Sequence, residues 1–453
     1  MKFPLVTAYV TNFNYSKYLE KAIYSLLEQS YQNIEILIID DGSTDGSIEI
    51  LKQFEEKHGL TVIFQQNKGL NATNNVALSQ AMGRYIMRLD ADDFLHPKAI
   101  EKMVLKIEQY PNACMVFPDY YNVDEQGEII NQVKRHNFED VSLLDQPAHG
   151  AITLLRTKHL KEVGGYDESF RRQDGYDLWL KLSHKYKVLN INEPLFYYRQ
   201  HGKSITDNEE KLLETRREIK YKHAKARRES DLNVLAVIPV RGHEFDENSL
   251  PFRKLGEKSL IDYSIQSAIE VKEIKNVIVT SPSQQVLGHI KNNFPKGVIA
   301  HKRNLNLAKV NQRIDQTLFQ VLEDYLKENQ KPDLVLLLYI EAPFRGSTII
   351  QEAIDTLKLY NVDAVEAVRQ ENGILYHHNG TTLTYLQENH DLKLERNDIF
   401  KRAGGMHLMR YDKLIEKKKL SFDRTGHIIL DQKSAHFIQT EIDWKIAECL
   451  LDN

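Results

Sequence analysis

The sequence predicts two doubly wound α/β domains joined by a charged helix. Short apolar strands alternate with amphipathic helices in each half of the chain. This alternation restarts at Val234, after the stretch 208–230, which is dense in Lys, Arg and Glu and has no Gly or Pro. The length of 453 residues also exceeds the roughly 100–200 residues of one ordinary domain. We therefore expect domains at 1–206 and 232–453, with a charged helical linker at 207–231.

The first half alternates strands and helices from its first residues. Because the strands are short and apolar and the intervening helices amphipathic, βαβ units and a mainly parallel sheet are expected. The expected strands are 4–10, 34–39, 61–64 and 85–89, and the expected helices are 18–29, 45–57 and 71–82.

The second half repeats the pattern, with strands at 234–240, 276–280 and 333–340 and a helix at 260–269. Before it, the stretch 209–229 carries eight basic and five acidic residues, several at i,i+4 spacing. Such spacing favours a solvated helix between domains. The alternative is a patch for acidic lipid or nucleic acid, although the interspersed acids weaken the field of such a patch.

Composition limits the class of protein. The apolar fraction of 42% and the charged fraction of 27% fit a globular chain, and the net charge of -4 gives no global attraction to nucleic acid or anionic membranes. Cys114 and Cys449 are too few for a disulfide framework, which fits a reducing compartment. No apolar run approaches the roughly 18–20 residues of a transmembrane helix. We expect a cytoplasmic protein with no transmembrane segment and no nucleic-acid partner.

Two acidic runs follow predicted strands. The first, IDDGSTDGS from Ile39 to Ser47, lies where ligands bind in open α/β sheets, beyond the carboxyl ends of the strands. A carboxylate there can accept hydrogen bonds from a nucleobase or ribose. The alternative is that Ser43, Thr44 and Asp45 cap the next helix.

The second run, RLDADD, follows the strand 85–89. Asp90 and Asp92 are two residues apart, so both can reach one ion if the chain bends between them. Hard divalent cations take oxygen ligands and often bind through one or two carboxylates and substrate phosphates. This pattern predicts a nucleotide-diphosphate site with Mg²⁺ or Mn²⁺. The alternative is that Asp93 caps a helix beginning near Pro97.

Several motifs in order give the first half a family resemblance. Residues 4 to about 204 resemble a family 2 glycosyltransferase with the GT-A fold. The motifs are DDGSTD (40–45), DAD (90–92), GGYDE (164–168), DGYDLWL (174–180) and YRQH (198–201). The resemblance implies inverting transfer of a sugar from a nucleotide donor.

The resemblance also implies site residues. Thr11 and Asp41 would contact the nucleoside, with Asn67 and Lys68 nearby. Asp92, helped by Asp90, would reach the diphosphate through the metal. His201 resembles a late histidine that lies near the metal or phosphates in many such enzymes. The alternative for His201 is a surface histidine before a turn.

The proton of the acceptor hydroxyl needs a base. In the family this base belongs to an acidic pair before a helix that carries a Trp, where this chain has Gln173 followed by DGYD. Asp174 is the first candidate and Asp177 the second, because Gly175 makes the register ambiguous. The alternative is that one of them caps the helix 178–185.

The second half resembles cytidylyltransferases that activate sialic-acid-type sugars as CMP esters. The motifs are IPVRG (238–242), LGEKSLIDYSI (255–265), APFR (342–345) and TEIDWKIAE (440–448). Together the two resemblances imply two Rossmann-like doubly wound domains, the first a GT-A glycosyltransferase and the second nucleotidyltransferase-like.

The second half departs from that family at its expected site. The family has Gly, Ser, Lys and Arg where this chain has a run from His243 to Asp246, and its two metal-binding aspartates correspond to Phe437 and Gln439. An aspartate of the family is also replaced within 281–283. These losses predict a noncatalytic domain that binds a ligand or forms a homodimer. The alternative is an active cytidylyltransferase, with Arg253 or Lys254 replacing the lost phosphate ligands.

The expected function is therefore a metal-dependent inverting glycosyltransferase of surface-polysaccharide or glycoconjugate synthesis. Its partners would be a nucleotide-sugar donor and a glycan or lipid-linked acceptor, and its cofactor Mn²⁺ or Mg²⁺. One alternative is a bifunctional enzyme whose second half also activates a sialic-acid-like sugar with CTP. Another is a noncatalytic binding or scaffold protein. Acids retained at strand ends argue against a scaffold, because a scaffold does not need them.

Overall fold

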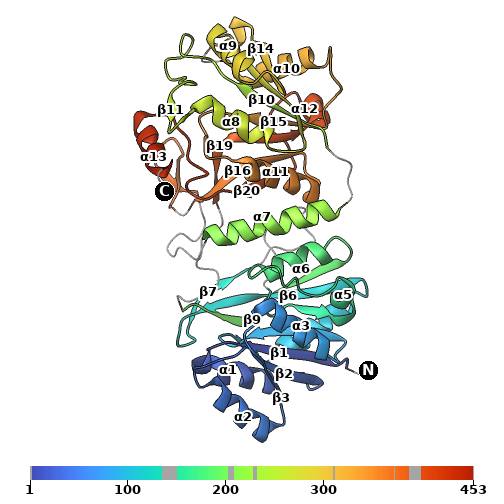
Figure 1. Ribbon diagram of the computed structural model, residues 1–453. Coiled ribbons are helices and arrows are strands. Elements are labelled where there is room, and N and C mark those ends of the chain that lie inside the picture. The colour runs from blue at the N-terminus through green and yellow to red at the C-terminus, as the bar shows by residue number, and fades with distance from the viewer. Residues whose placement is uncertain are drawn as a thin grey trace. The chain divides into compact units, whose positions relative to one another are not determined.

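The computed structural model describes residues 3–134, 150–201, 209–227, 232–309, 312–371, 373–386 and 399–451. The chain divides into two compact units, Met1–Ile219 with Ile374–Asn397, and Lys220–Gly373 with Asp398–Asn453. Each unit is an α/β structure built on its own sheet (Figure 1). The predicted fold class, α/β in both halves with parallel strands, is confirmed.

The strands and helices of the first unit follow the predicted alternation closely up to β4. They are β1 (Val6–Asn12), α1 (Ser16–Leu27), β2 (Ile34–Asp40), α2 (Ser47–His58), β3 (Thr61–Phe64), α3 (Leu70–Gln80), β4 (Tyr85–Asp90), β5 (Phe94–Leu95), α4 (Ala99–Glu108), β6 (Ala113–Val123), β7 (Ile129–Val133), β8 (Leu154–Arg156), α5 (Thr157–Glu162), α6 (Asp174–Leu182), β9 (Lys187–Arg199), β17 (Tyr376–His378) and β18 (Leu383–Tyr385). The main sheet has the order β3-β2-β1-β4-β8-β6-β9-β5, with β7 paired to β6.

The register of β1 decides which side chains share a face of this sheet. β1 runs parallel to β2 and to β4, with Tyr9 opposite Arg88 and Thr11 opposite Asp90. Because successive side chains of a strand point to opposite faces, these four residues lie on one face of the sheet. The carboxyl ends of β1, β2 and β4 lie together at one edge, since the three strands are parallel and adjacent.

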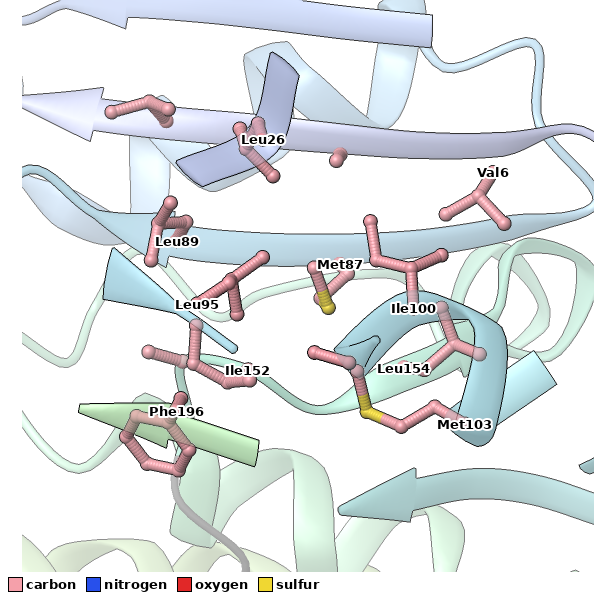
Figure 2. Packing of buried hydrophobic residues seen from close by; sticks show 14 of the residues in the cluster. Val6, Leu26, Met87, Leu89, Leu95, Ile100, Met103, Ile152, Leu154 and Phe196 are labelled. Atoms are coloured by element: carbon pink, nitrogen blue, oxygen red, sulfur yellow. The ribbon is translucent and has the colours of Figure 1, made fainter. Parts of the chain in front are cut away.

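The opposite face carries the main apolar core of the unit. Val6, Met87 and Leu89 from the strands contact Leu26 of α1 and Met103 of α4 in one buried cluster (Figure 2). The helices α1 and α4 turn apolar residues toward the sheet at three- and four-residue spacing, as expected for helices with one buried face. This packing leaves the other face of β1 and β4 for the polar residues described below.

The second unit has a sheet in the order β14-β13-β10-β15-β19-β16-β20. Its elements are β10 (Val234–Pro239), β11 (Lys254–Leu255), β12 (Lys258–Ser259), α8 (Leu260–Ile269), β13 (Ile274–Ser281), α9 (Gln284–Asn293), β14 (Val298–Lys302), a 3₁₀ turn (Leu305–Leu307), α10 (Ile314–Tyr325), β15 (Leu334–Leu338), α11 (Ser347–Tyr360), β16 (Ala364–Glu371), β19 (Ile399–Arg410), α12 (Tyr411–Lys417), β20 (Thr425–Ile429) and α13 (Glu441–Leu451). β15 is buried along its whole length, as its continuous apolar sequence predicts.

The helix α7 (Glu209–Ala226) corresponds to the stretch predicted as a charged linker, and the division between the units falls within it. Residues 207–208 and 228–231 of the predicted linker lie outside the described residues. In the part of the chain that the structure describes, no helix combines the length and apolarity needed to span a membrane.

Candidate functional site

The carboxyl ends of β1 and β2 are joined through Asn12. Its side-chain amide donates to Asp40 Oδ1 (2.7 Å) and to Ser43 Oγ (3.0 Å), and its carbonyl accepts from the amide of Asp41 (2.9 Å). The Ser43 amide also donates to Asp40 Oδ2 (2.9 Å). Asp40 therefore holds the turn after β2, and its carboxylate is occupied by bonds within the protein.

Asp41 holds the segment that contains Asn67 and Lys68, which the sequence places near it. The carboxylate accepts from Gln65 Nε2 (2.7 Å) and from the backbone amides of Lys68 (2.9 Å) and Gly69 (2.9 Å). A side chain at Gly42, whose φ is +82°, would lie 2.9 Å from the Asn67 amide, so the turn requires glycine. The structure thus brings Asp41, Asn67 and Lys68 together, with the Asp41 carboxylate used to position the segment.

The turn after β4 carries three aspartates in different surroundings. Thr11 Oγ1 donates to Asp90 Oδ1 (3.1 Å), which connects this turn to β1. Asp93 is buried and accepts from the amide of Arg199 (2.9 Å). Burial raises the pKa of Asp93 well above its usual range, and the nearby Asp92 and Asp90 raise it further. The other oxygen of Asp93, Oδ2, has no hydrogen-bond partner among the described residues. Asp93 does not cap the next helix, which begins at Ala99.

Arg199, at the end of β9, fixes this turn. Its Nε donates to the carbonyl of Asp92 (2.8 Å), and its Nη1 donates to the carbonyls of Asp124 (3.0 Å) and Glu125 (2.7 Å). The guanidinium lies 4.6 Å from the ring centroid of Tyr18. Arg199 belongs to the motif YRQH, but sequence reasoning assigned it no role. Its burial and its contacts with the β4 turn, which lies more than 100 positions away, become visible only in the structure.

His201 meets Asp92, as the sequence predicts for two residues of one site. His201 Nε2 and Asp92 Oδ2 are 2.8 Å apart, and their side chains are 5% and 16% exposed. The imidazole ring stacks on Tyr18, with 5.8 Å between centroids, and contacts the edge of Tyr15 at 5.6 Å. This packing is incompatible with a free surface histidine and fixes the ring beside Asp92.

Arg88 links two of the predicted acids, and sequence reasoning missed it. Its Nε lies 2.9 Å from Asp90 Oδ1, and its Nη1 lies 2.5 Å from Asp174 Oδ2. The Arg88 side chain is 4% exposed and that of Asp174 is 12% exposed. The Arg88 guanidinium thereby bridges Asp174, at the start of α6, and Asp90, next to the turn that carries Asp92. The signal in the sequence was an arginine inside an otherwise apolar buried strand.

Asp177 has different surroundings from Asp174. It is buried, and its Oδ2 pairs with Lys181 Nζ of the same helix (2.7 Å). The same Lys181 also donates to the carbonyl of Gly165 (2.9 Å). The residue before α6 is Gln173, and no side-chain capping bond forms there among the described residues. The expectation that one of the two aspartates caps a helix at 178–185 is therefore wrong, because α6 begins at Asp174 and both aspartates lie inside its first turn.

The donor set at the end of β4 fits a divalent cation that binds together with a diphosphate. Asp92 and His201 offer a carboxylate oxygen and an imidazole nitrogen at one point, and the buried Asp93 Oδ2 in the same turn lacks a partner within the described chain. Among the described residues, no cluster of three or more His, Cys, Asp or Glu forms a complete metal site. Two protein ligands are enough for cations such as Mg²⁺, which keep waters and phosphate oxygens as the remaining ligands.

The equivalent strand ends of the second unit are occupied by the protein's own acids. Glu244 Oε1 accepts from Ser283 Oγ (2.5 Å), and Asp246 Oδ2 pairs with Arg241 Nη1 (2.9 Å). A side chain at Gly242, whose φ is +89°, would lie 2.8 Å from Glu244 Oε2, so this carboxylate rests against the glycine turn. The loop that follows β10 is closed by these contacts.

The remaining residues named for this half are also engaged. Arg253 donates from both terminal nitrogens to Glu441 (2.6 and 2.7 Å), and its guanidinium lies 3.9 Å from the Trp444 ring. Phe437 faces Gly404, where an added methyl would lie 3.5 Å from the ring. The backbone amide of Gln439 donates to the Asp443 carboxylate in the first turn of α13. Arg253 is thus held against α13.

Comparisons with known proteins agree with both resemblances. Residues 7–163 match the family model described as Glycosyl transferase family 2, and residues 251–446 match the model described as Cytidylyltransferase. The second match begins directly after the loop that contains Glu244 and Asp246.

Similar proteins cover the first half. An uncharacterized glycosyltransferase of Methanocaldococcus jannaschii is 30% identical over 206 residues, which cover 43% of this chain and 71% of that protein. Chondroitin synthase of Escherichia coli is 31% identical over 207 residues, or 45% of this chain. This chain spans 30% of the length of that synthase and 21% of two Pasteurella multocida synthases. Among solved structures, S. aureus TarS 1-349 in complex with UDP is 19% identical with a TM-score of 0.41, over 50% of this chain and 67% of that one.

The motifs of the first half, the matched family model and a relative that this chain covers over more than two thirds of its length agree with one another. The chain therefore belongs to glycosyl transferase family 2, and its second half matches the cytidylyltransferase family model.

Proposed function

We propose that the first unit is a metal-dependent inverting glycosyltransferase that moves a sugar from a nucleotide-diphosphate donor to a hydroxyl of a glycan or other acceptor. The observation that carries this proposal is the chain of contacts from His201 through the β4 turn to Asp174. His201 meets Asp92, and Arg88 holds both Asp90 and Asp174. A diphosphate site and a base thus lie on either side of one buried arginine. The chondroitin and hyaluronan synthases among the relatives support a glycan acceptor.

Asp92 and His201 would hold Mn²⁺ or Mg²⁺, with Asp90 supporting the turn from its contact with Thr11. When bound, this cation would neutralise the charge that develops on the departing diphosphate. Arg199 keeps the turn in place through the Asp92 carbonyl.

The nucleoside would bind beside the segment that contains Asn67 and Lys68. Asp41 takes part by fixing the backbone of this segment, since its carboxylate already accepts three hydrogen bonds. Thr11 is placed between this region and the β4 turn. We therefore assign the contacts with the base and ribose to the segment around Asn67 and Lys68, with Asp41 as its support.

In the transfer step, the acceptor hydroxyl would attack the anomeric carbon while its proton passes to the Asp174 carboxylate. One bond forms between the acceptor oxygen and that carbon, and the bond from that carbon to the phosphate oxygen breaks. A single displacement of this kind inverts the anomeric configuration. Arg88 orients the Asp174 carboxylate through Oδ2, which leaves Oδ1 for the proton. Asp177 is assigned a structural role, because it is buried and paired with Lys181.

For the second unit we propose a noncatalytic role in ligand binding or assembly as a homodimer. The support is that Glu244 and Asp246 lie in the loop where a triphosphate would need cations, and that Arg253 is paired with Glu441. Carboxylates in these positions would repel a triphosphate. A bifunctional enzyme would instead require this loop to open and to bind CTP.

The proposal is tested by calorimetric titration of the full chain with UDP, GDP and CMP, with and without Mn²⁺. We expect UDP or GDP to bind only with Mn²⁺ and the binding to disappear in Asp92→Asn. Glu56→Gln, an exposed acid on α2, is the matched control and should bind as wild type does. Binding of UDP or GDP that is unchanged in Asp92→Asn would overturn the metal role. Binding of CMP without metal that survives this substitution would instead place a working nucleotide site in the second unit.

A further inference from the structure

We infer that Arg216 of α7 is a positioning residue for the base Asp174, acting through Gln173, whose side chain it binds. This inference rests on the proposed function of Asp174. Both residues belong to the first unit, and α7 follows the last strand of that unit's main sheet in the sequence. Sequence analysis gave this helix only the role of a linker.

Gln173 adopts a backbone conformation that its residue type rarely takes. Its φ is +60° and its ψ is +32°, in the left-handed region that glycine, asparagine and aspartate favour. Its carbonyl accepts from the amides of Tyr176 (3.0 Å) and Asp177 (3.1 Å), which starts α6. The direction in which the helix begins, and with it the position of Asp174, therefore depends on this one strained residue. Strained backbone of this kind persists only where surrounding contacts hold it.

Arg216 supplies such a contact. Its Nε and Nη2 donate to Gln173 Oε1 at 3.3 and 3.1 Å. The same guanidinium lies 5.0 Å from the ring centroid of Tyr176, in the first turn of α6. One planar group of α7 thus holds both the strained residue and the helix turn that follows it. An arginine is suited to this role because its donors form a rigid fork and its face can stack on an aromatic ring.

The consequence for catalysis follows from the position of Asp174. It is the residue after Gln173, and its Oδ2 lies 2.5 Å from Arg88 Nη1. A change of the Gln173 dihedrals would rotate the first turn of α6 and move Asp174 relative to the acceptor hydroxyl. Displacements of about 1 Å in a reacting group are enough to lower rates strongly. The donor and metal residues lie on other elements, so their binding would not change.

The test compares Arg216→Ala with wild type for release of UDP or GDP from a panel of UDP- and GDP-sugars with Mn²⁺. We expect kcat to fall about fivefold to twentyfold and the donor KM to stay within about twofold. The decisive variant is Gln173→Gly, because glycine adopts the left-handed conformation without support. In the Gln173→Gly background, Arg216→Ala should change kcat by less than about twofold. If Arg216 merely stabilised the fold, Arg216→Ala would lower kcat in the Gln173→Gly background as well.

Lys225→Ala, at an exposed basic residue of α7, is the control and should leave kcat unchanged. The inference is overturned if Arg216→Ala behaves as this control does, or if its loss of kcat is the same with Gly at 173. Hydrogen exchange of a peptide spanning 174–182 gives a readout without turnover. There, Arg216→Ala should speed exchange of the Tyr176 and Asp177 amides at least about fivefold, and unchanged exchange would overturn the inference. If no donor is turned over by wild type, the proposed function fails and the exchange result alone decides the role of Arg216.

Discussion

The strand ends at β1 and β10 are comparable places in two similar sheets, because β1 lies between β2 and β4 and β10 lies between β13 and β15. At β1, the carboxylates of Asp90 and Asp174 share Arg88, and the Asp92 carboxylate pairs with the imidazole of His201. At β10, Glu244 is bound by Ser283 and Asp246 is bound by Arg241.

The difference concerns what the acids face. A charged group at a buried strand end needs a partner, since isolated burial of a charge is costly. In the first unit one buried arginine serves two carboxylates, and the Asp92–His201 pair remains suited to a cation. In the second unit Asp246 pairs with Arg241 of the same loop, and Glu244 accepts a hydrogen bond from Ser283, which follows β13. Under the proposed functions, the same edge of the fold would keep or lose a ligand site through a few side chains.

The largest expected effect is on the base. Asp174→Asn removes the proton acceptor and should lower kcat about 10²- to 10⁴-fold, the usual contribution of a general base. Binding of UDP or GDP with Mn²⁺ should remain within about twofold, because the donor residues are intact. Steady-state kinetics on the donor panel and calorimetry measure the two effects. An equal loss of kcat in a stably folded Asp177→Asn, with Asp174→Asn near wild type, would transfer the role to Asp177.

A second prediction concerns Arg88. Arg88→Met leaves Asp90 and Asp174 unpaired in a buried place, which should destabilise the first unit by about 3–5 kcal/mol. Urea unfolding followed by circular dichroism measures this loss. Arg84→Met, at an arginine whose side chain is 56% exposed, should cost less than about 1 kcal/mol. Adding Asp90→Asn and Asp174→Asn to Arg88→Met should recover most of the loss. Failure to recover it would show that packing, not charge pairing, is the main role of Arg88.

A third prediction uses a buried acid of the second unit that has no arginine beside it. Asp355 of α11 accepts from Gln351 at 3.1 Å, and its Oδ2 has no partner among the described residues. Burial raises its pKa to about 6. The folded state then holds the proton more tightly than the unfolded state, in which the pKa of an aspartate is about 3.9. Stability contributed by this group is therefore lost as the pH rises from about 4 to 6.

Asp355→Asn removes the ionised form and should stabilise the second unit by about 1–3 kcal/mol at pH 8. At pH 4 the effect should be small, because the carboxyl is then neutral in the folded protein. Urea unfolding at the two pH values measures the difference. The same gain at pH 4 and pH 8 would mean that titration of Asp355 is not the cause.

The smallest expected effect is at the β10 loop. The Kd of wild type for CTP with Mg²⁺ should exceed about 1 mM. The double variant Glu244→Gln with Asp246→Asn should lower this Kd about tenfold, because two repulsive charges are removed and Arg241 is released. Glu247→Gln, an exposed acid of the same loop, is the control. Tight binding of CTP by wild type would show that the second unit kept a nucleotide site.

Sequence reasoning predicted the elements around the site well where local patterns decide them. The strands before Asp40 and Asp90 are apolar runs followed by turn residues, so their carboxyl ends and the acids that follow them could be read directly. The meeting of Asp92 with His201, 109 positions apart, was expected only from the family motifs. Arg88 and Arg216 were not assigned roles, because Arg88 reaches Asp174, 86 positions away, and Arg216 reaches Gln173, 43 positions away.

The sequence by itself determined the α/β class of both halves, the places of the acidic turns and the departures in the second half. The fold class and the turns follow from short-range periodicity and residue type, whereas the departures are visible only against the family that the second half resembles. Only the tertiary structure decided that Asp174 meets Arg88, because strand register and helix placement bring these two distant charges together. The pair of Asp177 with Lys181 is different, since helix geometry alone places residues four apart on one face.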